Sequence, residues 1–291
     1  MNQVYLFAVG ANLCFALGSQ VYTLFSRKVG AAWMNLFKAF VAFVLFGITI
    51  TLIGGWNSVQ PMYIGLLILS GFIGLGIGDV FLLRSFTEMG PGRTLMLFGF
   101  QPLILGTIGY VIFNQQVDFE KFWAITFFIL CILTFSIEAF RRDRHWQVKG
   151  ILMAFGGMLL DATGIIFTRL SFDNNPELTP LEGNFYRCFG GILVFIIWNM
   201  FKPMNFSGTF KKLTKKEKWL AIGGSILGTY LSLGLYLMAL QKAHLASLSG
   251  IAITGTIFSS AFECIIDRKW PSKYLIIAFV FFLLGMRILI F

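Results

Sequence analysis

Four charged residues lie inside long apolar stretches of the sequence: Lys38, Asp79, Asp161 and Arg187. A charge at the centre of a bilayer costs about 2.5–3.5 kcal/mol on insertion scales, so each of the four is a functional candidate. Asp161, within LLDATG, lies near the middle of its apolar run. It could be a structural carboxyl bonded to a neighbouring helix, or it could line a cavity, bind a cationic group and exchange a proton. We favour the cavity.

Lys38 and Asp79 are expected to form an ion pair. They occupy consecutive antiparallel segments at similar depth, and a paired charge costs far less in hydrocarbon than two separate ones. The pair would act either as a structural clamp or as a gate, and we favour the clamp. Arg187 is expected at the symmetric position near the opposite face, where Glu182 is its only evident partner.

Uncharged polar side chains within the apolar runs are further candidates for the substrate site. Each could face a cavity or form an interhelical hydrogen bond worth about 0.6–1 kcal/mol. These residues are Asn12, Gln20, Gln101, Tyr230, Thr254 and Thr256. The four cysteines are far apart and have no metal-ligand spacing, so we expect no metal and no cofactor.

Gly76-Ile77-Gly78-Asp79 matches the G-x-G-D motif of intramembrane aspartyl proteases, with Asp161 as a possible second carboxyl. Two such carboxyls sharing a proton could activate water. However, the presenilin-like pattern places its other aspartate before this motif and a Pro-Ala-Leu after it, and neither feature is present. The protease is therefore the weaker alternative, and the sequence carries no other enzyme motif.

The composition favours an integral membrane protein. Of the residues, 57% are hydrophobic and 12% are charged, whereas soluble domains carry about 25% charged residues. The net charge of +10 comes from Lys and Arg that flank apolar segments. Such charges set orientation and contact anionic lipids, so we do not expect nucleic-acid binding.

Ten apolar runs are long enough to be transmembrane helices, each needing about 20 residues. They run near Val4–Phe25, Ala31–Ile53, Met62–Leu83, Thr94–Phe113, Phe122–Phe140, Gly150–Leu170, Gly183–Phe201, Trp219–Leu240, Leu245–Ile265 and Tyr274–Ile290. The polar segment 141–149 divides them into two repeats of five, residues 1–140 and 149–291. An odd number of helices per half predicts oppositely oriented halves, as in many transporters. Lys38 matches Arg187, and Gly74 matches Gly228, as traces of the repeat.

The loops on one side of the predicted membrane carry most of the basic residues. These are Arg27, Lys28, Arg84, Arg93, Arg141, Arg142, Arg144, Lys149, the six lysines of segment 202–218, Arg268, Lys269 and Lys273. The other side has Lys121, Arg169, Lys242 and Arg287. The positive-inside rule therefore predicts that both termini lie outside the cytoplasm.

The whole chain resembles the drug/metabolite transporter superfamily, in its EamA-like branch. The resemblance rests on the ten-helix pattern, on Lys38 and Arg187, and on two segments, FTEMGPGRTLMLFGFQPLILGTIGY and FSSAFECIIDRKWPSKYLIIAFVFFLLGM. Asp267-Arg268 stands where the family usually has a Glu followed by a basic residue. Asn114-Gln115-Gln116, at the matching place in the first half, lacks the acidic residue. The family's usual tryptophan in the first helix is replaced near Phe15. The resemblance implies a basket-shaped bundle around a central cavity, with Phe15 at the substrate site. It also implies cytoplasmic termini, against the charge distribution.

We therefore expect a secondary transporter that moves a small metabolite, such as an amino acid-like, amine or drug-like solute, by alternating access. Proton-coupled export at Asp161 is one form of this hypothesis. A channel would need a ring of charges or a filter sequence, and neither is evident. A non-transporting membrane scaffold is a further alternative. We expect a monomer in the inner membrane of a bacterium, with the lipid bilayer and its solute as its partners.

Overall fold

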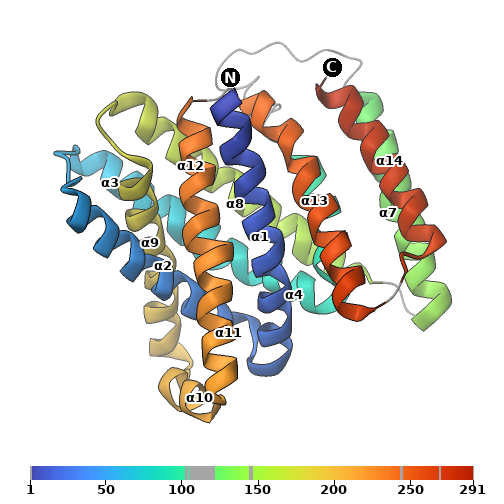
Figure 1. The fold of residues 1–291 in the computed structure, drawn as a ribbon, viewed down its shortest axis with the longest axis horizontal. Coiled ribbons are helices and arrows are strands. Elements are labelled where there is room, and N and C mark those ends of the chain that lie inside the picture. The colour runs from blue at the N-terminus through green and yellow to red at the C-terminus, as the bar shows by residue number, and fades with distance from the viewer. Residues whose placement is uncertain are drawn as a thin grey trace.

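The computed structural model describes residues 2–101, 104, 122–143, 147–242, 245–268 and 270–290, and the described chain is helical, with no β-strand (Figure 1). In chain order the elements are α1 (Asn2–Val29), α2 (Ala31–Ile53), α3 (Pro61–Ser70), the π-helix η1 (Gly71–Gly78), α4 (Asp79–Met89), α5 (Pro91–Leu97), the 3₁₀ turn η2 (Phe98–Phe100), α7 (Phe122–Asp143), α8 (Val148–Asn174), α9 (Pro180–Phe201), α10 (Phe206–Lys212), α11 (Lys215–Ser225), the π-helix η4 (Ile226–Leu231), α12 (Ser232–Lys242), α13 (Leu245–Asp267) and α14 (Lys273–Ile290).

Within these residues, six helical stretches are long and apolar enough to cross a bilayer. They are Leu6–Val29, Ala31–Ile53, Pro61–Met89, Val148–Asn174, Pro180–Phe201 and Lys215–Gln241. The prediction of an all-α membrane protein is thus confirmed. Helices α7, α13 and α14 correspond to the fifth, ninth and tenth predicted spans and contain 22, 23 and 18 residues.

The fourth predicted span, Thr94–Phe113, begins inside α5, includes η2 and then continues beyond the described residues. Asn114-Gln115-Gln116, Lys121, Arg144 and Lys269 also lie outside the described residues. The count of ten helices therefore stays a prediction.

Two helices begin where a Thr-x-x-Glu sequence satisfies the unpaired backbone groups of the first turn. At the start of α9, the Thr179 side chain accepts from Glu182 N, and the Glu182 carboxylate accepts from Thr179 N. Thr214 and Glu217 form the same capping box at α11. This reciprocal pairing is a strong local signal for a helix N-terminus, and it sets the first residues of α9 and of α11.

The connection after the third span is shorter than predicted. The sequence places the end of this span near Leu83, but the helix continues to Met89, and Gly90 is the only residue between α4 and α5. Phe86 and Met89 are buried, which accounts for the longer helix. Gly90 has φ +86°, a conformation that favours glycine, and Pro91 starts the next helix with a suitably fixed φ.

The two halves of the chain touch at glycine residues. A Cβ added at Gly71 would overlap the backbone oxygen of Arg187, and one added at Gly18 would overlap the backbone of Gly228. Small residues let helix backbones approach closely in membranes. The start of α1 and the end of α14 lie at one end of the bundle, and α10, in the lysine-rich segment, lies at the other (Figure 1).

Candidate functional site

A central cavity of about 200 Å³ is lined by residues from both halves of the chain. Its polar and charged lining residues are Asn12, Lys38, Asp79, Gln101, Asp161, Arg187, Thr229, Ser232, Tyr236 and Thr256. The four intramembrane charges predicted from the sequence all reach this cavity. Phe15 lines it as well, beside the apolar side chains of Leu75, Leu82 and Phe98. Charges held together in one small internal space can contact a solute that enters it.

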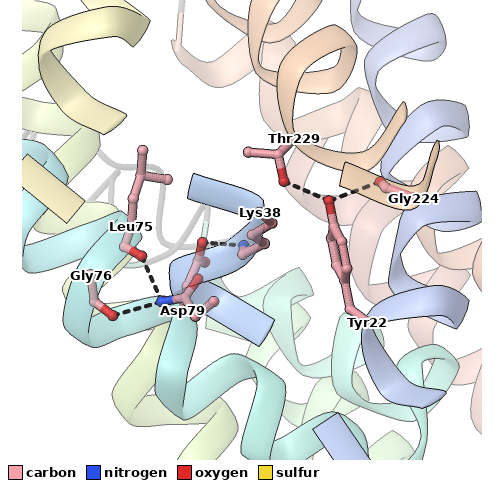
Figure 2. Close-up of polar contacts among 8 residues, drawn as sticks. Tyr22, Lys38, Leu75, Gly76, Asp79, Gly224 and Thr229 are labelled. Carbon is pink, nitrogen blue, oxygen red and sulfur yellow. Dashed lines mark hydrogen bonds and ion pairs between the residues drawn. The ribbon is translucent and has the colours of Figure 1, made fainter. Parts of the chain in front are cut away.

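Lys38 and Asp79 form the expected ion pair, with Lys38 Nζ 2.5 Å from Asp79 Oδ2 (Figure 2). Both side chains are largely buried, at 4% and 13% exposure. Lys38 Nζ also lies 5.1 Å from the centre of the Tyr22 ring, where the negative face of the aromatic system attracts a cation. The pair therefore neutralises one positive and one negative charge at the cavity wall.

Asp161 extends into the cavity from α8 and is held by Gln101. Gln101 Nε2 donates a 2.7 Å hydrogen bond to Asp161 Oδ2. Within the described residues, the direct partner of this carboxyl is an amide, whereas Asp79 is paired with a cation. A carboxyl with an uncharged partner keeps the capacity to bind a cation or to exchange a proton.

Arg187 is on α9 and is only 1% exposed. Its Nε donates to Ser70 Oγ at 3.2 Å, and its Nη1 is buried with no hydrogen-bond partner among the described residues. The expected partnership with Glu182 is corrected, because Glu182 accepts from the backbone and side chain of Asn57 and caps its own helix. Residues five apart in an α-helix point about 140° away from each other, which separates Glu182 from Arg187.

Two π-helical segments border the cavity, η1 in the third span and η4 in the eighth. A π turn interrupts the regular hydrogen-bond ladder, and such turns are frequent at functional sites. Asn35 Nδ2 donates 2.9 Å hydrogen bonds to the backbone oxygens of Leu75 and Gly76. Near η4, Tyr22 Oη donates to Gly224 O at 3.1 Å and lies 2.5 Å from Thr229 Oγ1 (Figure 2).

Both matched glycines of the predicted repeat lie in these segments, Gly74 in η1 and Gly228 in η4. The Asn35 side chain contacts the π turn of the first half, and the Tyr22 side chain contacts that of the second half.

Three of the predicted polar residues do not line the cavity, which corrects that expectation. Gln20 Nε2 donates to Ser259 O at 3.1 Å, which joins α1 to α13. Tyr230 Oη lies 2.7 Å from Thr49 Oγ1, on the side of η4 facing α2. Thr254 Oγ1 accepts from Asn12 Nδ2 at 3.0 Å, so it hydrogen-bonds to Asn12, which lines the cavity. Interhelical hydrogen bonding, the alternative role of such residues, applies to all three.

Sequence reasoning missed three polar residues of the cavity: Thr229, Ser232 and Tyr236. Their spacing of three and four residues places them on one face of a helix. These three polar residues on one face of an otherwise apolar segment could have indicated from the sequence which face lines the cavity.

A bundle of apolar helices around a charged internal cavity is an arrangement found in secondary transporters. The model of the EamA-like transporter family matches residues 2–137 and 148–291, once in each half. The chain therefore belongs to the EamA-like transporter family, in the drug/metabolite transporter superfamily, and is a membrane transporter with a small-molecule substrate.

The fold is also similar to that of a solved structure described only as "Crystal structure of protein". The TM-score is 0.71 at 12% sequence identity, and the match covers 98% of this chain and 94% of the other. At that identity the likeness concerns the fold alone. The comparison with curated proteins gives no match.

The family membership supports a protein that is not an enzyme. The side chains agree with this interpretation. An aspartyl protease needs two carboxyls that share a proton, whereas Asp79 is paired with Lys38 and Asp161 accepts from Gln101.

Proposed function

We propose that this chain is a secondary transporter that carries a small metabolite by alternating access, with the site at Asp161. Two five-helix repeats, residues 1–140 and 149–291, would rock against each other around the cavity. The observation that carries the proposal is that both halves contribute charged and polar side chains to one internal cavity. Lys38, Asp79 and Gln101 come from the first half, and Asp161 and Arg187 from the second.

The proposed architecture has ten spanning helices in two inverted repeats. It is supported by the positions of the chain ends, which share one end of the bundle (Figure 1). An even total of spans returns the chain to its starting side, and five spans per half give the halves opposite orientations. The π turns near Gly74 and Gly228 occupy corresponding helices of the two halves, which also supports the repeat.

Asp161 is proposed as the residue that links transport to a proton or to a cationic group of the solute. An intramembrane carboxyl that faces a cavity can alternate between a proton and a substrate. Its amide partner, Gln101, can hydrogen-bond to the carboxyl in either protonation state. Proton-coupled export of an amino acid-like, amine or drug-like solute is the form of transport that we favour.

Solute exchange in vesicles tests the proposal. Purified protein is reconstituted into liposomes loaded with a mixture of amino acids, organic acids and amines, and efflux is followed by mass spectrometry. We expect protein-dependent efflux of at least one solute, accelerated when that solute is present on the opposite side. Flux without this acceleration would indicate a channel. A carrier must reorient after each release and can do so faster when it is loaded, whereas a pore does not reorient. Absence of flux for every solute would indicate a scaffold and reject the carrier.

A further inference from the structure

Arg187 is the least satisfied charged group among the cavity residues. The residue is almost completely buried, at 1% exposure, yet among the described residues its guanidinium makes one hydrogen bond, from Nε to Ser70 Oγ. Its Nη1 has no partner among the described residues, and no described carboxylate lies within 4.0 Å to form an ion pair. A buried charge without a partner is strongly unfavourable. The free-energy cost of keeping this arginine unpaired suggests a functional role for it.

The surroundings of Arg187 distinguish it from the other buried cation. Lys38 is paired with Asp79, so those two charges cancel. Asp161 shares the cavity with Arg187, but its direct contact is the amide of Gln101. Within the described residues, Arg187 is thus the cation of the cavity wall that no carboxylate contacts directly.

The position of Arg187 is also fixed before any solute binds. Its backbone oxygen packs so closely on Gly71 that a Cβ there would overlap it, and Ser70 orients the guanidinium through Nε. A planar guanidinium held in this way offers its remaining N–H groups in a fixed fork. Such a fork matches the oxygen atoms of a carboxylate or a phosphate.

We propose that Arg187 is the anion-binding residue of the cavity and that the transported solute carries a carboxylate or phosphate group. This inference rests on the proposed carrier function. The anion receives hydrogen bonds from the free edge of the guanidinium, and Ser70 is the positioning residue that keeps this edge toward the cavity. Asp161 remains available for a hydrogen-bond donor elsewhere on the same solute.

Ligand-induced stabilisation of the purified protein tests the anion site directly. The probes are phenylacetate, phenyl phosphate, the neutral phenylacetamide and phenethylamine, compared at constant ionic strength. A ligand that binds only the folded state raises the melting temperature. We expect at least one of the two anions to raise it by on the order of 2–4 °C, and phenylacetamide to have a much smaller effect. The larger shift of the two anions identifies carboxylate or phosphate as the group recognised.

Variants assign the effect to Arg187. Arg187→Gln should weaken binding of the preferred anion by at least about 10-fold, and Arg187→Lys should weaken it less. Arg169→Gln, which removes a partly exposed arginine of α8, should leave the shift unchanged. If Arg187→Gln does not fold, Ser70→Ala keeps the charge and removes its orienting contact, and we expect an intermediate loss.

The proposal fails if neither anion stabilises the protein, if phenylacetamide does so equally well, or if both Arg187→Gln and Ser70→Ala keep the full anion effect. These results are distinct from failure of the carrier function. Exchange of uncharged or cationic solutes alone would retain the transporter and reject the anion site. Anion binding without any flux would retain the site and reject the transporter.

Discussion

Gln101 donates a 2.7 Å hydrogen bond to Asp161, and this contact joins the first half of the chain to the second across the cavity. The two residues are 60 positions apart in sequence. If the halves move against each other during transport, this hydrogen bond must be kept, exchanged for a solute contact or broken. It is therefore a sensitive place to perturb the cycle without changing charge.

Gln101→Leu should slow transport by roughly 10-fold or more, because it leaves the Asp161 carboxyl without its donor. The measurement is initial flux in proteoliposomes at equal protein content. Gln20→Leu is the matched control, since Gln20 makes a hydrogen bond between helices but does not line the cavity. Its flux should stay within about twofold of the wild type. Equal losses in the two variants would contradict a special role for the Gln101–Asp161 contact.

The Lys38–Asp79 pair should contribute to stability only while both partners are present. Removal of one member of a buried pair costs about 3–5 kcal/mol, so Lys38→Met is expected to lower the free energy of unfolding by that amount. The double variant Lys38→Met/Asp79→Asn should recover part of this loss. Unfolding in detergent micelles measures both effects.

Lys149 and Glu88 form an exposed ion pair with side-chain exposures of 69% and 39%, and this pair is the control for the Lys38–Asp79 variants. Lys149→Met should change stability by about 0–1 kcal/mol. A clamp role for the buried pair is ruled out if Lys38→Met and Lys149→Met have the same effect.

Gly18→Ala should destabilise the protein by about 1–3 kcal/mol, because the added methyl group forces α1 away from Gly228 in η4. Gly65→Ala in α3 is the control, since no atom outside its own helix lies within 4 Å of the added Cβ. Thermal unfolding of both variants in one detergent provides the measurement. A smaller loss for Gly18→Ala than for Gly65→Ala would show that the close approach of α1 and η4 does not limit stability.

Single cysteines at opposite ends of the bundle test the predicted orientation. Ser58, between α2 and α3, and Ser207, in α10, are both exposed. The positive-inside rule predicts that a membrane-impermeant maleimide labels Ser58→Cys in intact cells and labels Ser207→Cys only after permeabilisation. The unsubstituted protein gives the background from its four native cysteines. The reverse pattern would place the termini in the cytoplasm, as the family resemblance implies.

Much of the fold follows from the sequence because hydrophobic length sets the spans. The expected bounds of the second span, Ala31–Ile53, are those of α2 itself. The Lys38–Asp79 pair could also be predicted, since depth along two consecutive helices requires no knowledge of packing. The extension of the third span to Met89 could not, because it depends on burial of Phe86 and Met89 against other parts of the chain.

The direction of individual side chains was less predictable. Helices in lipid are apolar on the lipid face and on the packed face, so hydrophobicity alone does not identify the cavity face. A π turn adds a residue and rotates the following side chains by about 100°. Tyr230, inside η4, contacts Thr49, whereas Ser232 and Tyr236, after η4, line the cavity.

The most direct test of the proposed carrier is pH-dependent flux in proteoliposomes that contain Asp161→Asn. Asp173→Asn, on the same helix with 46% side-chain exposure, is the matched control. We predict that Asp161→Asn folds normally but loses at least about 10-fold of the flux, or loses its dependence on pH, while Asp173→Asn behaves like the wild type. Unchanged flux with an unchanged pH profile in Asp161→Asn would contradict a transport site at this carboxyl.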